Sequence, residues 1–400
     1  MDPYIAEWLN LLVRSLHVVA AIAWIGSSFY FIALDYSLRP PSDPSNIARG
    51  VGGESWEIHG GGFYRVEKFR VAPETLPERF TWFKWEAYTT WLSGFALLVL
   101  LYYLNPGTYL IDRSVADLAP LHAVGISIGI LVLSWFVYDS LCRLLEAHDQ
   151  LLAAILAALV IAVAYGTSLL FASRAVYIQV GAMIGTWMVA NVFFVIIPGH
   201  WDLVRAKQAG SAPDPTPGLR GKQRSVHNNY LTLPAIFAML SNHFPVTHGH
   251  EHGWLILVAI FGILVSVRHF FNLRHQGQTV WAIPVGAAAA TALLAIAIAP
   301  SRPGAAGSGA TEPLVPFDRV QAIIELRCQT CHSDHPTQEG FGAPPMGVTF
   351  DTSEQIRAQA ERIEQMAVIT ETMPLGNVTE MTQDERDTLG AWIRQGAKLD

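Results

Sequence analysis

The chain alternates long apolar runs with short polar segments over its first 300 residues. Eight of these runs are long enough, as helices, to cross about 30 Å of hydrocarbon. They are residues 8–33, 85–104, 121–141, 150–171, 175–197, 229–245, 254–273 and 280–300. The sixth is the weakest, because it is short, is interrupted by Pro234 and is polar at both ends. The pattern predicts a mainly α fold, in which residues 1–300 form a membrane domain of about eight transmembrane helices.

One polar segment, residues 39–84, differs from the other connections between apolar runs. Aromatic and β-branched residues stand on both sides of three consecutive glycines, Gly60 to Gly62. Such residues favour strands, and adjacent glycines favour a tight turn. The segment therefore predicts a small two-stranded β-ribbon that is inserted between the first two membrane helices and folds against them.

Beyond residue 300 the chain becomes polar. Residues 301–313 are rich in glycine and other small residues and predict a flexible linker. Residues 314–400 are expected to form a separate all-α domain, with helices at Pro316–Arg327 and Thr382–Lys398. Thr382 and Glu385 have the spacing of a capping box, which marks the start of the second helix.

Composition supports a membrane protein. Hydrophobic residues make up 51% of the chain and charged residues only 15%, which is unusual for a soluble protein. The net charge is -7, and the basic residues are spread along one face of the predicted membrane domain. No nucleic-acid partner is therefore expected.

The polar tail carries the motif Cys328-Gln-Thr-Cys331-His332. Two thiols at this spacing can form thioether bonds to both vinyl groups of a haem, and the adjoining imidazole can bind the iron. A zinc site would need a second pair of ligands, and the only other cysteine, Cys142, lies in a predicted membrane helix. The motif predicts one covalent haem c, attached at Cys328 and Cys331, with His332 as an axial iron ligand.

The second axial ligand is expected on the loop between the two tail helices. Met373 precedes Pro374 there, and a methionine thioether from such a loop raises the haem potential. Three other methionines compete for this role, namely Met346, Met366 and Met381. Met366 lies in a helical pattern typical of a core position, and Met346, which follows two prolines, is the stronger rival. With Met373 as ligand, the tail resembles a class I cytochrome c domain.

Haem c is attached outside the cytoplasm, so the tail is expected in the periplasm, and eight spans then place the N-terminus there too. The positive-inside rule agrees, because the predicted inner loops hold most lysines and arginines and the outer loops hold only Arg113 and Arg174. The first apolar run is not expected to be a cleaved signal, since no small-residue cleavage site follows it. We therefore expect a multi-pass protein of the bacterial inner membrane, with its ribbon in the cytoplasm.

Histidines within membrane spans are candidates for function, because ionisable groups are costly there. By predicted depth, His17, His122 and His243 lie toward the outer face. A haem b or a metal ion bound by them would lie beneath the periplasmic haem. The alternative is that each is an interfacial histidine that bonds to a neighbouring helix.

Two further groups point to ligands. His248, His250 and His252 alternate in an outer loop, a pattern that binds zinc or copper or that simply belongs to a flexible wet loop. Near the inner face, the planar guanidinium of Arg268 could hold an anion. The alternative for Arg268 is an extension to the lipid headgroups.

A family resemblance rests on the ribbon segment and on the tail. Residues 52–64 read Gly-Gly-Glu-Ser-Trp-Glu-Ile-His-Gly-Gly-Gly-Phe-Tyr, and Lys68, Ala72-Pro73 and Trp82-Phe-Lys-Trp-Glu-Ala-Tyr88 follow. Together with the haem motif, these make the chain resemble the membrane-bound cytochrome c urate oxidases over essentially its whole length. The resemblance implies an oxidoreductase of purine catabolism that oxidises urate to 5-hydroxyisourate. It further implies that electrons pass to the fused haem c and then to a respiratory acceptor, such as a soluble cytochrome c or a terminal oxidase, without formation of hydrogen peroxide.

A second, shorter likeness leaves other functions open. Leu16-His17 and Ala23-Trp24-Ile25-Gly26 are similar to the first helix of small membrane protoporphyrinogen oxidases, in which that histidine serves haem. A membrane dehydrogenase or protoporphyrinogen oxidase acting on another substrate is one alternative. A transporter or metal-handling protein with a redox-sensing tail is another.

Urate sets requirements for a binding site. At neutral pH it is a flat, electron-rich monoanion, so we expect a cation, an aromatic ring for stacking and a base nearby. The ribbon and the inner helix ends supply these types of residue, with Lys68 or Lys84 as the cation and His59 or Glu86 as the base. The candidate urate-site residues are Trp56, His59, Lys68, Lys84, Glu86 and Arg268. The alternative is that the ribbon is a plain packing element.

Overall fold

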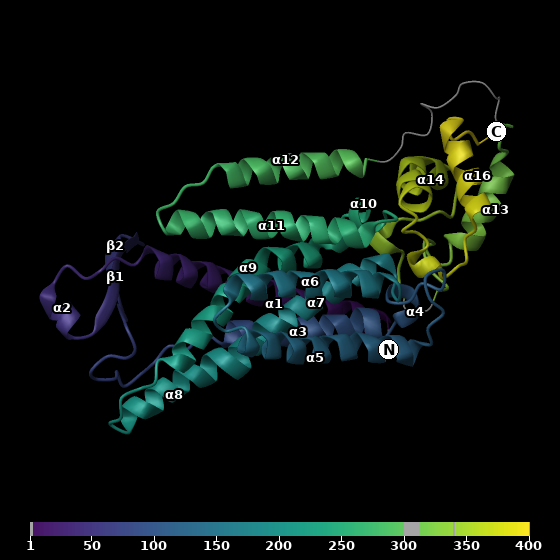
Figure 1. Ribbon diagram of the computed structural model, residues 1–400. Coiled ribbons are helices and arrows are strands. Elements are labelled where there is room, and N and C mark those ends of the chain that lie inside the picture. Colours follow the sequence, from purple (N-terminus) through teal and green to yellow (C-terminus); the bar gives the residue numbers. More distant parts are fainter. Residues whose placement is uncertain (1–2, 300–312, 339–340, 400) are drawn as a thin grey trace.

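The computed structural model describes residues 3–299, 313–338 and 341–399. Long helices lie side by side in a bundle, and a smaller helical domain, formed by the tail, covers one end of it (Figure 1). The N-terminus lies near the tail domain, whereas the β-ribbon projects from the opposite end. The predicted linker, residues 301–313, lies outside the described residues except for its last position.

Each predicted apolar run lies mainly on a helix. In chain order the helices of the bundle are α1 (Pro3–Ser37), α3 (Trp85–Leu98) with its π-helical continuation η1 (Val99–Tyr103), α5 (Pro120–Leu144), α6 (Asp149–Ser168), α7 (Ser173–Ala190) with η2 (Asn191–Ile196) and α8 (Ile197–Gln208), α9 (Thr216–Leu240), α11 (Gly253–His275) and α12 (Ala282–Ala297). Short helices lie between them, namely α2 (Pro44–Ala48), α4 (Pro106–Tyr109), η3 (Ser241–His243) and α10 (Pro245–His248).

Five of the helices in the described part of the chain are long and apolar enough to cross a membrane. They are α1, α5, α6, the continuous helix formed by α7, η2 and α8, and α11. The helices of the other three predicted spans are not long and apolar enough to be counted, for different reasons. α3 has only 14 residues before its hydrogen bonding widens, α9 begins in polar sequence at Thr216, and α12 has 16 residues. Their crossing of a membrane stays a prediction.

The helix over residues 173–208 widens to π-helical hydrogen bonding at Asn191–Ile196, just before Pro198. Proline has no N–H for a helical hydrogen bond, and its ring crowds the preceding turn. A π-turn absorbs such a disturbance, and π-bulges are frequent at functional sites. Here the side chain of Asn191 is fully buried inside the bundle.

The ribbon forms as predicted, but it does not fold against the helices along its whole length. β1 (Val51–His59) and β2 (Gly62–Phe69) pair in antiparallel register around Gly60 and Gly61, whose φ angles of +58° and +81° favour glycine. The tip extends away from the bundle (Figure 1), and its apolar side chains Ile58 and Phe63 are exposed. Contact with the helices extends from the base of the ribbon, where Lys68 pairs with Asp35, to Glu57 near the turn, whose Oε2 accepts a hydrogen bond of 2.6 Å from the Tyr30 hydroxyl of α1.

The tail domain has its own hydrophobic core, separate from that of the bundle. Its helices are α13 (Phe317–Arg327), α14 (Ser353–Ala358), α15 (Ala360–Ile363) with η5 (Glu364–Ile369), and α16 (Gln383–Arg394), with single turns at η4 (Pro345–Gly347) and η6 (Leu375–Asn377). Thr382 and Glu385 form both hydrogen bonds of the predicted capping box. α16 ends earlier than expected, at Arg394, and Gly396 follows with a φ of +95°.

Candidate functional site

The ribbon residues predicted for a substrate site lie in solvent or in ion pairs. Trp56 is 63% exposed and His59 is exposed beside the turn. Lys68, at the base of the ribbon, pairs with Asp35 of α1, and Asp35 also pairs with Lys222 of α9 at 2.8 Å. This group of three charges joins the ribbon to two helices, so Lys68 already has an anionic partner.

The two predicted residues at the start of α3 lie together but are not joined to the ribbon residues. Lys84 Nζ lies 5.8 Å from the ring centroids of both Trp82 and Trp85. Glu86 lies in the first helical turn, and one of its buried carboxylate oxygens has no hydrogen-bond partner. Within the described residues, no hydrogen bond or ion pair links any two of the six predicted urate-site residues.

Arg268 is the predicted site residue that lies deepest, with 5% of its surface exposed. Its Nε donates a hydrogen bond of 2.9 Å to Asn229 Oδ1 on α9, and its guanidinium carbon lies 4.0 Å from the ring centroid of Phe29 on α1. The helices α1, α9 and α11 pack against one another here. In the part of the chain that the structure describes, no carboxylate forms an ion pair with Arg268.

Several buried polar atoms of α9 and α11 also lack partners. They are Arg268 Nη2, Asn229 Nδ2, and both Nδ2 and Oδ1 of Asn272. Asn272 lies one turn beyond Arg268 on α11, and both asparagines are almost fully buried. Buried polar groups are nearly always hydrogen-bonded, and each one left without a partner costs about 1–3 kcal/mol. A polar ligand would satisfy this set.

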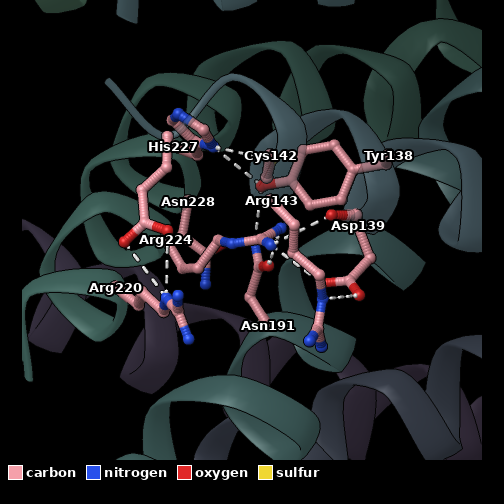
Figure 2. A network of polar contacts seen from close by, with 10 residues as sticks. Tyr138, Asp139, Cys142, Arg143, Asn191, Arg220, Arg224, His227 and Asn228 are labelled. Atoms are coloured by element: carbon pink, nitrogen blue, oxygen red, sulfur yellow. Dashed lines mark hydrogen bonds and ion pairs between the residues drawn. The ribbon is translucent and has the colours of Figure 1, made fainter. Parts of the chain in front are cut away.

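A second buried arginine, Arg224 of α9, has a full set of partners (Figure 2). It is 3% exposed, and its Nη2 lies 2.8 Å from Asp139 Oδ1 of α5. Its Nη1 lies 3.3 Å from Asn191 Oδ1, and its guanidinium carbon lies 5.1 Å from the ring centroid of Tyr138. This arrangement neutralises the charge, as a buried cation requires.

The hydrogen bonds around Arg224 extend across three helices (Figure 2). Asn191 donates to the Tyr138 hydroxyl and to Asn228 Oδ1, each at 2.9 Å. The same hydroxyl lies 2.8 Å from His227 Nδ1. Asn228 is the neighbour of Asn229, so adjacent residues of α9 face the two arginine sites.

Sequence reasoning selected Arg268 but missed Asn229, Asn272 and Arg224. Each is a polar residue in or beside an apolar run, and that is a usable signal, because such residues are costly in a membrane. The sequence does not show which of them meet, since the contact between α9 and α11 depends on how the two helices pack.

The three outer histidines do not share one environment. His17 Nδ1 lies 2.9 Å from the Thr90 carbonyl oxygen and 3.1 Å from Ser93 Oγ, and its ring packs against the backbone at Gly94 of α3. His122 and His243 are exposed. A role for these residues in binding a haem or a metal stays a prediction.

The histidines of the outer loop also differ from one another. His250 is partly exposed and His252 is exposed, whereas His248 is 4% exposed and neither of its ring nitrogens has a partner. Burial, and then the nearby positive charge of Arg174, lowers the pKa of His248 to about 4. Among the described residues, no three histidine, cysteine, aspartate or glutamate side chains are grouped to hold a metal ion.

The Cys-Gln-Thr-Cys-His motif follows α13 directly. Its two cysteines form no disulfide, and burial raises the pKa of Cys328 to about 12. His332 Nδ1 donates a hydrogen bond of 3.0 Å to the Val348 carbonyl oxygen, which leaves Nε2 unprotonated. Burial lowers the pKa of His332, although this hydrogen bond opposes the change. The imidazole is therefore neutral and oriented, as an iron ligand must be.

The candidate methionines are distinguished by burial. Met346 is 93% exposed, and Met381 is packed in the tail core. Met373 is half-buried and packs against the same core as Cys328. The buried Arg386 of α16 holds the loop of Met373, because its Nη1 donates a hydrogen bond of 2.8 Å to the Met373 carbonyl oxygen.

The loop of Met373 is also the part of the tail that touches the bundle. Gly376, just after it, lies so close to the backbone carbonyl groups of Gly107 and Thr108 in α4, and of Ile111 just after it, that a side chain would not fit. Gly249, just after α10, lies equally close to Thr370. Tyr109 of α4 lies within electrostatic range of Cys331. The haem motif and its candidate methionine are therefore seated on the end of the bundle.

Comparison with known proteins gives one match. A family model described as "Urate oxidase N-terminal" matches residues 3–299. No curated protein and no solved structure was matched. The matched region covers the bundle and the ribbon and ends before the tail. The chain therefore belongs to the urate oxidase N-terminal family.

Proposed function

We propose that the bundle oxidises urate to 5-hydroxyisourate and passes the electrons to a haem c that is covalently attached at Cys328 and Cys331. Family membership links residues 3–299 with urate. The observation that carries the electron route is the contact of the Met373 loop with α4 of the same bundle. A one-electron acceptor seated on the urate-related domain is the arrangement that such a route needs.

The reaction balances with water as the oxygen source. Urate and one water molecule give 5-hydroxyisourate, two protons and two electrons. A haem held by Cys328, Cys331 and His332 would accept one electron at a time, so the two electrons would leave in succession. A respiratory acceptor, such as a soluble cytochrome c or a terminal oxidase, then takes them, and no hydrogen peroxide forms.

The residues of the tail fit a haem c. The two cysteines form no disulfide, and Cys328 packs against the tail core. His332 presents a free Nε2, and Met373 lies on a loop that Arg386 holds in place. His332 and Met373 would hold the iron, and the methionine would raise its potential.

The arrangement of the two ends supports a location in a bacterial inner membrane. The N-terminus and the tail lie at one end of the bundle, and the ribbon lies at the other (Figure 1). The ribbon end also carries most of the lysines and arginines, which favours the cytoplasm for it. The haem would then face the periplasm.

The test is anaerobic reduction of the purified full-length protein by urate. We expect the α band of reduced haem c to appear together with 5-hydroxyisourate. A variant with both Cys328→Ser and Cys331→Ser should lack covalent haem and should release no product. Reduction by a porphyrinogen or a quinol but not by urate, or no reduction by any donor, would overturn the proposal.

A count of haems belongs to the same experiment. Pyridine haemochrome spectra separate covalent haem c from haem b. We expect one haem c for each chain. A haem b in addition would point to His17, which is the half-buried member of the three outer histidines.

A further inference from the structure

The strongest unexplained feature of the bundle is a buried positive charge without a counter-ion. Arg268 donates one hydrogen bond, to Asn229, and stacks on Phe29, but its Nη2 has no partner. A buried, always ionised guanidinium is unfavourable unless an anion neutralises it. Arg224 shows the usual solution in the same bundle, with Asp139 as its anion. For Arg268 the described chain supplies no carboxylate, and a bound anion would neutralise it.

The atoms around Arg268 define what kind of anion fits. The unpartnered atoms comprise three N–H donors, on Arg268, Asn229 and Asn272, and one carbonyl acceptor, on Asn272. Carboxylates and phosphodiesters only accept hydrogen bonds, so they would leave the acceptor of Asn272 unpaired. A ligand with both carbonyl and N–H groups on its edges would pair with all four atoms. These four atoms therefore favour an anion that both donates and accepts hydrogen bonds.

Urate has this edge chemistry. Its rings carry carbonyl oxygens and N–H groups in alternation, and at neutral pH it bears one negative charge. The planar guanidinium of Arg268 matches a planar anion, and an amide of the asparagine type matches a neighbouring carbonyl and N–H pair. Phe29 adds an apolar ring face beside the guanidinium.

Arg268, Asn272 and Asn229 lie close enough on α11 and α9 to form one site. Arg268 and Asn272 are four residues apart on α11, so their side chains lie on the same face. Asn229 on α9 is fixed against Arg268 by the 2.9 Å hydrogen bond. Tyr36 of α1 and Tyr230 of α9 lie within electrostatic range of the guanidinium. α1, α9 and α11 thus enclose the site, about 10 Å from the ribbon end of α11 and about 22 Å from its other end, so electrons would need a second redox group, such as a haem b held by His17, to reach the tail.

We propose that Arg268, Asn229 and Asn272 bind the urate anion between α1, α9 and α11. This inference rests on the proposed function, because it names the place where that substrate is held. The exposed ribbon residues Trp56 and His59 then have no contact with the substrate.

Binding can be measured apart from turnover. With the haem fully reduced by dithionite under argon, the protein has no electron acceptor, so urate binds without being oxidised. Urate should raise the melting midpoint of the wild-type protein, because a ligand that binds only the folded state stabilises it. We expect Arg268→Gln to bind urate about 100-fold more weakly and Asn272→Leu about 10-fold more weakly. Arg274→Gln, which removes an exposed charge six residues further along α11, is the matched control and should bind like the wild type.

The melting midpoints of the variants without urate provide a second test. A binding role and a purely structural role predict changes of opposite sign. Asn272→Leu replaces two unpaired polar atoms with apolar ones of similar size, so the melting midpoint without urate should rise by about 2–4 °C. Arg268→Gln removes an unpaired charge and should also raise it. If these residues only hold the helices together, both midpoints should fall instead.

The outcomes separate this inference from the proposed function. If the wild type neither binds nor oxidises urate, the proposed function fails and the site fails with it. If the wild type does both, but Arg268→Gln and Asn272→Leu keep its urate affinity, only the site is overturned. Loss of affinity in His200→Ala alone would also overturn it, because it would move the substrate to the 260 Å³ pocket at the ribbon base, which Trp82 and His200 help to line.

Discussion

Two buried arginines of this bundle differ in whether a carboxylate neutralises them. Arg224 and Arg268 are almost equally buried, and adjacent asparagines of α9, Asn228 and Asn229, face their two sites. Arg224 is neutralised by Asp139, whereas Arg268 has an asparagine and an aromatic ring but no carboxylate. Burial alone therefore does not mark a functional residue. The informative feature is a buried charge whose surroundings are incomplete.

The largest expected effect on stability comes from removing the carboxylate that neutralises Arg224, so that Arg224, like Arg268, lacks an anionic partner. Asp139→Asn would leave a buried guanidinium without its anion and should destabilise the protein by about 3–5 kcal/mol. Thermal unfolding of the full chain measures this. Asp202→Asn is the control, because Asp202 pairs with Arg205 on the surface and its loss should cost less than about 1 kcal/mol. Equal effects of the two substitutions would contradict the role assigned to Asp139.

His248 offers a third way to bury a basic group, which is to keep it neutral. The folded chain protonates it only near pH 4, whereas the unfolded chain does so near its ordinary pKa of 6.5. The unfolded state therefore binds more protons between these values, so stability is complete above pH 6.5 and decreases as the pH falls toward 4. The expected loss is about 3 kcal/mol, since each pKa unit corresponds to about 1.4 kcal/mol.

The pH dependence of the melting midpoint tests this contribution. His248→Leu should flatten the profile between pH 6.5 and 4, and the exposed His252→Leu should leave it unchanged. An unchanged profile in His248→Leu would show that other groups cause the decline. Gly249, next in the chain, packs against Thr370, so the same acidification should also loosen the contact of the tail with the bundle.

The smallest effect is expected at the ribbon tip, which carries residues that resemble a substrate site in sequence but lack the surroundings of one. The double variant Trp56→Ser and His59→Ala should change stability by less than about 0.5 kcal/mol, because both side chains are exposed. Urate affinity, measured with the reduced protein, should also be unchanged. A tenfold loss of affinity would place the substrate at the ribbon.

Much of the fold follows from local patterns in the sequence. Apolar runs predict the bundle helices, Gly60 and Gly61 predict the turn of the ribbon, and Thr382 with Glu385 predicts the start of α16. These signals are local, because each depends on neighbours within a few residues. The polar start of α9 and the widening of α3 at Val99 are less visible, and they account for the helices that fall short of a membrane span.

The candidate site was only partly predictable for a physical reason. Arg268 is recognisable as a charge in an apolar run, but its pairing with Asn229 depends on the packing of α9 against α11. Likewise, the partner of Lys68 proved to be Asp35 of α1, which removed it as a free cation. The Cys328 to His332 motif needs no such information, so the prediction of a covalent haem there rests on the spacing alone and stays a prediction.

The most direct test of the account is an anaerobic titration of the oxidised full-length protein with urate, followed in the α band of haem c. The account predicts that each urate reduces two haems in the wild type and in Arg274→Gln. Arg268→Gln should stay oxidised at the same urate concentrations and still be reduced by dithionite. Reduction of Arg268→Gln with the urate dependence of the wild type would contradict the account.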